Sequence, residues 1–578
     1  METTTALSPQ QLGRLIRVSR GLEPADLVLA NGRVVNVCTG GIDEAEVAVA
    51  EGVIAGVGPG YQGRERYDCA GRYLCPGFID GHLHLESSLL SPLELARAVL
   101  PRGTTTVVGD PHEIANVLGL AGIHWLLAAS ADLPLSVFFT APSCVPATPL
   151  ETAGAAISAA DLAPLLDHPR ILGLAEVMNF PGLLAGDPEV LAKVLAARRR
   201  RLPVDGHCPG LSGRDLAAYV AAGIDSDHEA TTAAEAREKL AAGMWLAIRE
   251  GSSARNLADL LPGVPPAACG RAFFVSDDRH PVDLARQGHL DHILRLAVAQ
   301  GLAPVTAVAM ASRSPAERFG LRDRGMIAPG RRADLVLVED LAGFRVQAVF
   351  AAGRLVARDG AALGLPPPAA GAAAGRVHID WSRVDLAVAA AGDRLRVIGL
   401  LPGQLLTQAR FLPVRREGGL AVADPGRDLL KLAVIERHQA SGRVGLGFVQ
   451  GFGLTGGALA GTVAHDSHNL IVVGTNDADM LLAARSVAEL GGGLAVASQG
   501  RVLATLALPI AGLMTGAPLH AVVEDLTGLH RAAASLGCLL PDPFMALSFL
   551  ALPVIPQLKL TDHGLVDVER FAIVPLFA

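Results

Sequence analysis

The amino-acid sequence predicts an α/β protein with three parts: a (β/α)8 TIM barrel, a small β domain built from both flanking segments, and a C-terminal α/β domain. Three observations lead to this fold class. Short apolar runs alternate with helical stretches in the middle of the chain, Val-rich segments lie on both sides of that block, and a stretch rich in Pro, Gly and Ala precedes residues 377–578. A chain of 578 residues also exceeds the size of one hydrophobic core.

The small β domain is predicted from two segments far apart in the sequence. Residues 1–72 contain two strand-like stretches with Gly turns, ADLVLANGRVVNV and AEVAVAEGVIAGVG, and the motifs ADLVL and Gly-Arg recur in residues 327–360. Either this repetition is a coincidence among Val-rich strands, or the two segments form one domain. We predict one domain.

The barrel is predicted to span residues 73–326, where helical segments lie between most of eight apolar runs of strand length. The eight runs cover residues 73–80, 104–110, 133–141, 170–176, 202–207, 222–228, 244–250 and 272–277. In a barrel of this kind the catalytic side chains lie at the C-terminal ends of the strands. The strand ends are therefore the place to look for functional residues.

The end of the chain is predicted to form a separate domain. Residues 361–376 are rich in Pro, Gly and Ala, which is typical of a linker, and residues 377–578 follow it as an α/β domain. One uncharged run, residues 502–523, has the length of a membrane span, but Pro509 and Pro518 interrupt it. We expect a buried strand and a turn there.

The composition favours a cytoplasmic enzyme without nucleic-acid or membrane partners. The net charge is -8, whereas a nucleic-acid-binding protein would show a basic face. The seven cysteines are scattered without a Cys-x-x-Cys pair, which is typical of a reducing compartment and excludes a thiolate metal site. The first residues lack the apolar segment of a signal peptide.

Four histidines and two carboxylates end the predicted strands and could bind metal ions. They are His82 and His84 after the first strand, Glu176 after the fourth, His207 after the fifth, His228 after the sixth and Asp277 after the eighth. Residues two apart share one face of a strand, so both histidines of the first strand can point into the barrel mouth. Such a set would satisfy two divalent ions about 3.5–4 Å apart, and imidazole and carboxylate ligands suit Mn, Fe or Zn.

These motifs resemble the amidohydrolase superfamily and, within it, the long bacterial adenine deaminases, over essentially the whole chain. The most specific segments include PGFIDGHLHLESS, GTTTVVGDPHEIANVLG, DGHCPGLSG, FVSDDRHP and AHDSHNLIVVGTNDADM. Glu176 stands where many binuclear amidohydrolases carry a carbamylated lysine, which is consistent with the adenine deaminase branch. The resemblance implies deamination of adenine to hypoxanthine and ammonia, with water as co-substrate and a metal-activated hydroxide as nucleophile. It also implies two divalent ions per chain, Mn or Fe rather than Zn, and we expect a homodimer or a higher homo-oligomer.

The resemblance also assigns roles to the strand-end residues. His82 and His84 would bind the more buried ion, His207 and His228 the more exposed one, and Glu176 both. Asp277 would bind metal and take the proton from the nucleophile. The leaving amine needs a second acid, for which Glu113, Glu229 and Asp278 are all candidates.

Further polar residues near the strand ends are candidates for contacts with the substrate or the ligands. They are Asp110 and His112, with Asn179 and Ser87 in loops. Asp110 and His112 would either end the second strand and share its face, or belong to a structural turn, because Asp-Pro is also a turn signal. His465 and His468 are secondary candidates. Their segment would either reach over the barrel mouth, where it could also bind a further metal ion, or form a polar turn with helix caps. Glu86 is placed outside the metal-binding set.

Three other functions fit parts of the pattern. Another cyclic C–N hydrolase of the same superfamily, acting on a cyclic amide or on another aminopurine or pyrimidine, would use the same ligands. A non-catalytic scaffold would have lost some of them, yet all six positions carry competent side chains. A nucleic-acid deaminase would carry a Cys-x-x-Cys motif, which this sequence lacks.

Overall fold

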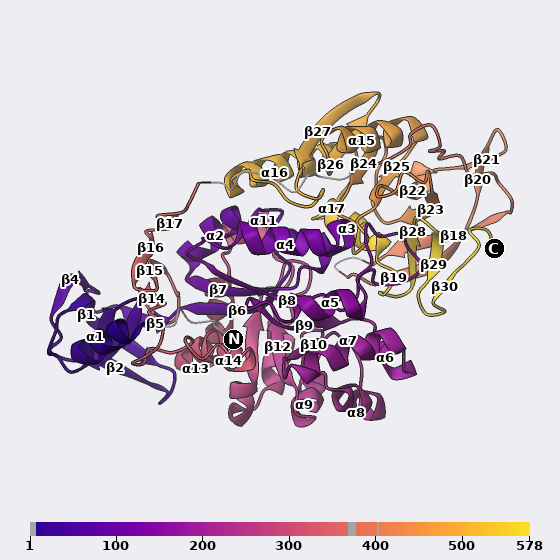
Figure 1. Ribbon diagram of the computed structural model, residues 1–578. Coiled ribbons are helices and arrows are strands. Elements are labelled where there is room, and N and C mark those ends of the chain that lie inside the picture. Colours follow the sequence, from indigo (N-terminus) through magenta and orange to yellow (C-terminus); the bar gives the residue numbers. More distant parts are fainter. Residues whose placement is uncertain (1–6, 368–376, 402–403) are drawn as a thin grey trace.

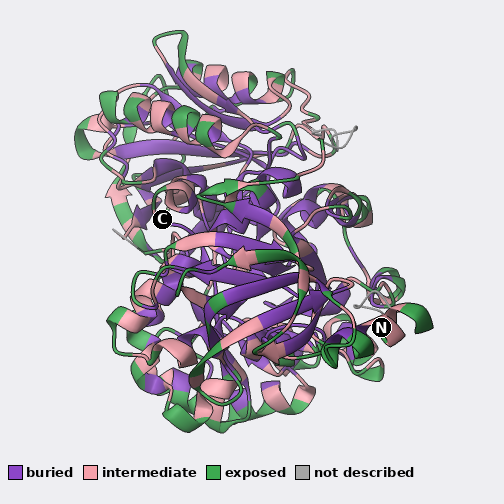
Figure 2. Ribbon diagram, turned by 90° about the vertical axis from the view of Figure 1, so that its left-hand side faces the viewer, coloured by how far each residue is buried: buried purple, intermediate pink, exposed green. Residues whose placement is uncertain are grey.

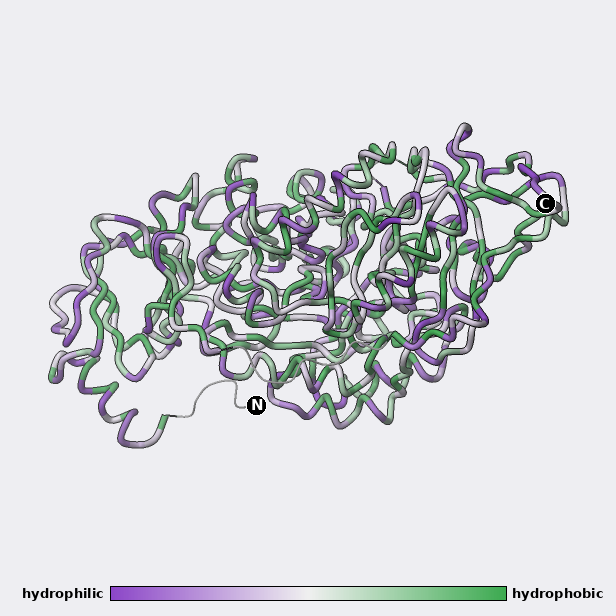
Figure 3. Tube along the Cα trace, turned by 90° about the horizontal axis from the view of Figure 1, so that it is seen from above, coloured by the Kyte–Doolittle hydropathy of each residue, from purple (hydrophilic) through white to green (hydrophobic). Residues whose placement is uncertain are grey.

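The computed structural model describes residues 7–367, 377–401 and 404–578, which form three parts arranged in the order the sequence predicts (Figure 1). The small β domain lies at one end, the barrel in the middle, and the C-terminal domain covers one face of the barrel. The view from above (Figure 3) also places the two smaller parts at opposite ends of the molecule. Of the predicted linker 361–376, residues 368–376 lie outside the described residues.

The small β domain contains a nine-stranded sheet to which both flanking segments contribute. Its order is β17-β16-β15-β14-β5-β1-β2-β3, with β4 paired to β1. The strands are β1 (Ala25–Asn36), β2 (Gly41–Ala50), β3 (Val53–Gly58), β4 (Gly63–Asp68), β5 (Tyr73–Pro76), β14 (Leu335–Val338), β15 (Val346–Ala351), β16 (Arg354–Arg358) and β17 (Ala361–Ala362). The antiparallel pair of β5 and β14 joins the two segments. Helix α1 (Pro9–Ser19) packs its buried Leu15 and Val18 against this sheet.

The barrel has eight parallel strands, so the predicted fold class is confirmed. They are β6 (Phe78–Leu83), β7 (Thr104–Gly109), β8 (Ser136–Ala141), β9 (Ile171–Val177), β10 (Val204–Gly206), β11 (Ser226–Asp227), β12 (Trp245–Arg249) and β13 (Ala272–Val275). Strands β6 to β10 and β11 to β13 form two arcs. Backbone hydrogen bonds from Asp225 N to Val204 O and from Asp277 N to His82 O, both 3.1 Å, connect the arcs at their two seams.

The first predicted barrel strand covers parts of two strands that belong to different sheets. Residues 73–80 were predicted as the first barrel strand, but Tyr73–Pro76 is β5 of the small domain. Gly77 separates it from β6, and a Cβ atom there would lie 2.2 Å from Thr105 Oγ1. A continuous apolar run thus serves two sheets, which periodicity alone does not reveal.

Helices surround the barrel and share one core of buried residues with its strands. Figure 2 shows buried, intermediate and exposed stretches along their ribbons. They are α2 (Pro92–Val99), α3 (His112–Leu118), α4 (Leu120–Ala129), α5 (Ala159–Leu165), α6 (Phe180–Ala185), α7 (Pro188–Arg199), α8 (Gly213–Ala222), α9 (Ala233–Ala241), α10 (Leu257–Leu260), α11 (Pro281–Arg286), α12 (Leu290–Ala299), α13 (Pro304–Met310) and α14 (Arg313–Arg318). Several begin with a cap followed by proline, as at α7, where Asp187 accepts from Glu189 N and Pro188 needs no hydrogen bond.

The C-terminal domain contains an eight-stranded sheet in the order β19-β18-β23-β22-β25-β24-β26-β27. Its strands are β18 (Arg394–Leu400), β19 (Thr407–Pro413), β22 (Leu429–Ile435), β23 (Val444–Gln450), β24 (Ala458–Gly461), β25 (Leu470–Gly474), β26 (Gly493–Ser498) and β27 (Arg501–Ala507). Helices α15 (Asp477–Glu489), α16 (Leu519–Ser535) and α17 (Pro543–Ser548), a hairpin of β20 (Arg415–Glu417) and β21 (Leu420–Val422), and a small sheet of β28 (Leu558–Thr561), β29 (Gly564–Asp567) and β30 (Ala572–Ile573) complete it.

The uncharged run 502–523 is not a buried strand. It begins in β27, which is the edge strand of the sheet and exposes Val502 and Leu503, and it ends inside α16. Within the described part of the chain, we find no helix with the length and apolar character of a membrane span.

The C-terminal domain is attached to the barrel by hydrogen bonds between backbones and side chains. Ser91 N donates to Thr515 O and Thr515 N donates to Leu89 O, each over 2.8 Å. Asp562 accepts from both the backbone N and the Oγ1 of Thr152, at 2.9 and 2.6 Å. These contacts hold the domain over the C-terminal ends of the barrel strands.

Candidate metal centre at the barrel mouth

The barrel mouth brings together the six residues predicted as metal ligands, called here the strand-end group: His82, His84, Glu176, His207, His228 and Asp277. His82 and His84 lie at the end of β6. Because successive side chains of a strand point to opposite faces, both imidazoles point to the same side, with ring centroids 5.0 Å apart. His82 also stacks on His228 at 4.1 Å. All except His207 are buried, so the group forms the floor of the mouth.

Glu176 lies in the centre of the group. Its Oε1 is 3.5 Å from His84 Nε2, while its Oε2 is 2.6 Å from His207 Nδ1 and 3.2 Å from His228 Nε2. Burial raises the pKa of this carboxyl group, but His228 and His207 outweigh that effect and lower the pKa well below its usual range. Each oxygen of an ionised Glu176 therefore faces a different set of imidazoles.

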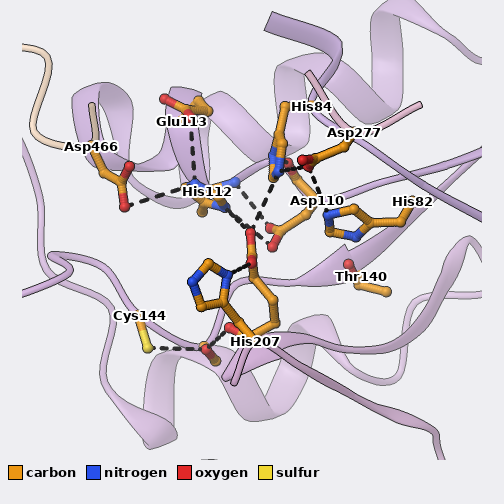
Figure 4. A network of polar contacts seen from close by, with 12 residues as sticks. His82, His84, Asp110, His112, Glu113, Thr140, Cys144, His207, Asp277 and Asp466 are labelled. Carbon is orange, nitrogen blue, oxygen red and sulfur yellow. Dashed lines mark hydrogen bonds and ion pairs between the residues drawn. The ribbon is translucent and has the colours of Figure 1, made fainter. Parts of the chain in front are cut away.

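Asp277 follows β13, which lies next to β6, and its carboxylate faces the first two histidines (Figure 4). Its Oδ1 is 3.2 Å from His84 Nε2 and 3.4 Å from His82 Nε2. The backbone of Asp277 has a φ of 53°, a conformation that costs energy in a residue with a side chain. Hydrogen bonds from Asp277 N to His82 O and from His84 N to Asp277 O hold it there, so three potential ligands are fixed together.

The residues present fit a pair of divalent cations. Several overlapping sets of three residues, such as His82, His228 and Asp277, could each hold an ion. Within each set the ligand atoms lie within 4.8 Å of one another. His82 Nε2 is buried and has no hydrogen-bond partner among the described residues. Imidazole and carboxylate groups without thiolate suit Mn, Fe or Zn. A cation between these atoms would use lone pairs that hydrogen bonds leave unused.

Arg249 at the end of β12 is a site residue that sequence reasoning missed. Its guanidinium donates to Asp277 Oδ2 over 2.9 Å and to both oxygens of Glu229. Burial raises the pKa of Asp277, but Arg249 and the two histidines outweigh it and lower the pKa. The sequence did contain a sign of this role: the apolar run WLAIR ends in a charged residue, which a barrel strand does not need for packing.

The three candidates for the second acid have different partners. Glu229 is tied to Arg249, although its Oε1 is also 3.5 Å from His228 Nε2. Glu113 is held by histidines of the C-terminal domain, as described below. Asp278 accepts a 2.5 Å hydrogen bond from Ser87 Oγ and remains partly exposed. It is also one of the carboxylates that raise the pKa of His84, against the effect of burial.

Asp110 and His112 do not share a strand face, contrary to the prediction. β7 ends at Gly109, and His112 is the first residue of α3, which Pro111 precedes. Asp110 Oδ1 accepts from His112 N at 3.2 Å, and its Oδ2 lies 3.1 Å from His112 Nδ1. The turn places the His112 ring between two acids: Nδ1 is 3.6 Å from Glu176 Oε1 and Nε2 is 3.4 Å from Glu113 Oε1.

The candidate Asn179, and Glu86, which the sequence places outside the metal-binding set, both make local structural contacts. Asn179 caps α6, because its side chain accepts from Gly182 N at 3.0 Å. Glu86 lies in the short helical turn Leu85–Ser88 after β6, and its Oε1 accepts from Ile114 N at 3.0 Å, outside the strand-end group. Burial and the charge of Glu113 raise the pKa of Glu86 to about 7. Its Oε2 is buried without a partner among the described residues.

The segment with the two secondary candidates reaches the barrel mouth. His465 and His468 lie in the loop between β24 and β25, and both contact Glu113, with 2.7 Å between His465 Nδ1 and Glu113 Oε1. Asp466 Oδ2 is 3.9 Å from His112 Nε2 (Figure 4). We call Glu113, His465 and His468 the interdomain group. The first part of this segment thus reaches the barrel mouth, while Asn476 at its other end caps α15, as the alternative of a polar turn with helix caps predicts.

A cavity of about 780 Å³ lies between the barrel mouth and the C-terminal domain. Its inner wall contains Glu86, Ser87 and Glu113 from the barrel and His465 and His468 from the C-terminal domain. The outer wall is largely apolar and comes mainly from α16, α17 and the residues around them. A space of this size, with a few polar groups at one end, is typical of a site for a small molecule.

The chain is similar to known proteins over nearly its whole length. The amidohydrolase family matches residues 73–356, and the adenine deaminase C-terminal domain matches residues 404–572. The adenine deaminase of Desulfatibacillum aliphaticivorans is 51% identical over 565 residues, which are 98% of this chain and 99% of that protein. The adenine deaminase of Nitratidesulfovibrio vulgaris strain DP4 is 52% identical over 569 residues, 97% of this chain and 98% of that protein. Among solved structures, a beta-aspartyl dipeptidase from Fervidobacterium islandicum AW-1 has 17% identity and a TM-score of 0.46, and the match covers 59% of this chain and 99% of that chain. Because the two relatives share about half of their residues with it along nearly its whole length, the chain belongs to the adenine deaminase family of the amidohydrolases.

Proposed function

We propose that the chain catalyses the hydrolytic deamination of adenine to hypoxanthine and ammonia at a binuclear metal centre. The observation that carries the proposal is the position of Glu176, which turns one oxygen to His84 and the other to His207 and His228. The names of the relatives supply the substrate.

The strand-end group would hold the two ions. His82, His84 and Asp277 would bind one of them, His207 and His228 the other, and Glu176 would bridge both. Bound divalent ions would lower the pKa of water and so supply the nucleophile near neutral pH. The ligand types suit Mn, Fe or Zn, and we propose Mn or Fe.

Asp277 is proposed to receive the proton of the attacking water. Its Oδ1 faces His82 and His84, where the water would react, while Arg249 holds Oδ2. An ionised carboxylate is required for this step, and Arg249 stabilises that form. The guanidinium thereby fixes both the direction and the protonation state of the base.

Asp278 is proposed to protonate the leaving amine. Glu229 is committed to the guanidinium of Arg249, and Glu113 accepts from two imidazoles, so neither holds a proton readily. Among the described side chains, Ser87 is the one that donates a hydrogen bond to Asp278. Asp278 is partly exposed and directly follows the proposed base Asp277, so it could reach both solvent and the substrate.

The purine would lie in the inner part of the cavity, between the strand-end group and the interdomain group. Ser87, Glu113 and Glu86, whose Oε2 has no partner among the described residues, are polar groups of the barrel that line the cavity. His112 lies between Glu113 and Glu176. Hydrogen bonds from such groups would discriminate strongly between bases, because a wrong base would leave them unpaired.

Ammonia release and the change in ultraviolet absorbance test the proposal directly. The purified protein, loaded separately with Mn, Fe and Zn, is assayed with adenine, adenosine, cytosine and a cyclic amide. Turnover of adenine alone supports the proposal. Hydrolysis of the cyclic amide without ammonia release from adenine would replace it with the alternative cyclic C–N hydrolase. Light scattering in the same buffer measures whether the chain forms the expected homodimer or higher oligomer.

A further inference from the structure

His465 is one of the polar residues of the cavity wall that have a buried atom without a partner among the described residues. Its Nδ1 contacts Glu113 Oε1 at 2.7 Å, and Phe549 stacks on its ring with centroids 4.5 Å apart. These two contacts fix the plane and direction of the imidazole. Its Nε2 is buried but has no hydrogen-bond partner among the described residues. A buried polar atom of this kind needs a partner from outside the chain.

The composition of the interdomain group is that of a metal site, but its hydrogen bonds argue against one. His468 Nδ1 accepts from the backbone N of Ala464 at 3.1 Å. A backbone N–H can only donate, so Nδ1 offers its lone pair there and Nε2 must carry the ring proton. His468 Nε2 then donates to Glu113 and has no lone pair for a cation.

The charge balance of the group decides the state of His465. Glu113 is 2% exposed, and a carboxylate buried so deeply needs a positive partner. His468 is neutral in the tautomer that its backbone contact requires. Burial lowers the pKa of His465, but Glu113, Asp278 and Asp466 outweigh this and raise the pKa to about 9. His112 Nε2 also faces Glu113 Oε1, at 3.4 Å. Of the two imidazoles supplied by the C-terminal domain, His465 is the cation, and its free Nε2 carries a proton to donate.

The position of His465 relative to the metal centre fits the far edge of a purine. His112 lies 3.6 Å from Glu176 Oε1 and 3.4 Å from Glu113 Oε1, and Glu113 in turn contacts His465. His465 is thus separated from Glu176 by two side chains. A base whose amino carbon lies at the metal centre would turn its opposite edge, with its ring nitrogens, toward the cavity wall that contains His465.

We propose that His465, supplied by the C-terminal domain, donates a hydrogen bond from Nε2 to an unprotonated ring nitrogen of the purine. Glu113 and His468 are positioning residues that fix this imidazole. The inference rests on the proposed function for the substrate class, and it gives the C-terminal domain a part in substrate recognition. The consequence is that a base without the relevant ring nitrogen is bound more weakly.

Calorimetric binding of purine, which lacks the amine and is not deaminated, tests the inference on the metal-loaded protein. The ligands are purine and its 1-deaza, 3-deaza and 7-deaza analogues, and the variants are His465→Leu and His465→Gln. We expect the wild type to bind one deaza analogue about 10- to 100-fold more weakly than purine, the effect of one hydrogen bond to a charged group. His465→Leu should bind purine as weakly as that analogue, and the analogue itself should lose nothing further. His465→Gln, whose amide N–H can replace Nε2–H, should recover part of the affinity.

His280→Leu is the matched control, because His280 also lines the cavity and has a buried Nε2 without a partner, but it contacts Asp542 instead of Glu113. It should leave the preference among the four ligands unchanged. If His465→Leu weakens all four ligands by the same factor, or none of them, the inference is overturned. Should the variants not fold, the wild type alone still decides: equal affinity for purine and all three analogues contradicts the hydrogen bond. Absence of ammonia release from adenine by the wild type would instead contradict the proposed function.

Discussion

The strand-end group and the interdomain group consist of the same residue types, yet they use them in opposite ways. In the strand-end group the imidazoles and carboxylates come from five barrel strands, and His82 Nε2 has no hydrogen-bond partner in the described part of the chain. In the interdomain group one carboxylate accepts from two imidazoles, and a backbone N–H fixes the tautomer of His468. The first arrangement leaves lone pairs for cations, whereas the second pairs its charges internally.

The difference shows that residue composition does not identify a metal site. The interdomain group, and each of several sets of three residues within the strand-end group, have ligand atoms within 4.8 Å of one another. The two groups differ in their hydrogen-bond donors and acceptors. A neutral histidine that accepts a hydrogen bond from a backbone N–H carries its proton on the other ring nitrogen, which then has no lone pair for a metal. We propose metal binding for the first group and substrate recognition for the second, and each proposal can be tested separately.

Glu176→Gln should have the largest effect, because it removes the residue that faces both sets of histidines. We expect metal content to fall from about two ions per chain to one or none, and kcat for adenine to fall by at least roughly 10⁴-fold, as for residues that act as one catalytic unit. Elemental analysis and an ammonia assay measure the two effects. Glu113→Gln is the matched change in the interdomain group and should keep the full metal content. Loss of metal from Glu113→Gln would break the comparison.

Asp278→Asn should lower kcat by roughly 10²- to 10³-fold, the contribution of a positioned acid, without changing metal content. Ser87, which donates to Asp278, should show the same effect more weakly when changed to Ala. Activated substrates with a better leaving group than ammonia should recover much of the activity of Asp278→Asn. If they do not, the proton comes from another group, and Glu229→Gln would then be the variant with the larger loss.

The parts of the site that could be predicted are those that follow from strand periodicity. His82 and His84 are two residues apart in a strand, and each of the other ligands ends its own strand, so local sequence placed all six. Arg249 was missed because a charged residue at the end of WLAIR has no motif of its own. Residues 73–80 were assigned to one strand because a continuous apolar run does not show where one sheet ends and the next begins.

The interdomain group could not be assembled from the sequence for a different reason. Glu113 and His465 are 352 residues apart, and they meet only because the C-terminal domain docks on the barrel. The same limit applies to Asp110 and His112, where a two-residue spacing suggested a shared strand face but Pro111 leads into helix α3 instead. Spacing predicts contact only while the element continues.

Arg249→Lys should have a moderate effect, since it keeps a positive charge but cannot hold Asp277 and both oxygens of Glu229 together. We expect kcat to fall about 10-fold, as a misplaced supporting residue of a metal ligand typically costs. The pKa of Asp277 is lowered by Arg249, so a weaker contact raises it. Activity requires the ionised carboxylate and is lost as pH falls, so the acidic limb of the kcat/KM profile should move to higher pH. Arg318→Lys, which changes a buried arginine paired with Asp205 and Asp225, should leave that limb in place.

Asp562→Ala should have the smallest effect, and it tests whether docking of the C-terminal domain positions the interdomain group. Asp562 accepts from Thr152 N and Oγ1, and Asn469 at the end of the His465 loop donates to Thr152 O at 2.8 Å. Without Asp562 the loop should open more often, so purine affinity should fall a few-fold while metal content and the pH profile stay unchanged. Hydrogen exchange of residues 464–469 should become faster in the same variant.

Asp428→Ala is the control and should leave purine affinity unaltered. It removes a carboxylate that accepts from Gly451 N and Gly453 N within the C-terminal domain. Faster exchange of the loop with unchanged purine affinity would separate the docking contact from substrate recognition and leave His465 without its proposed role.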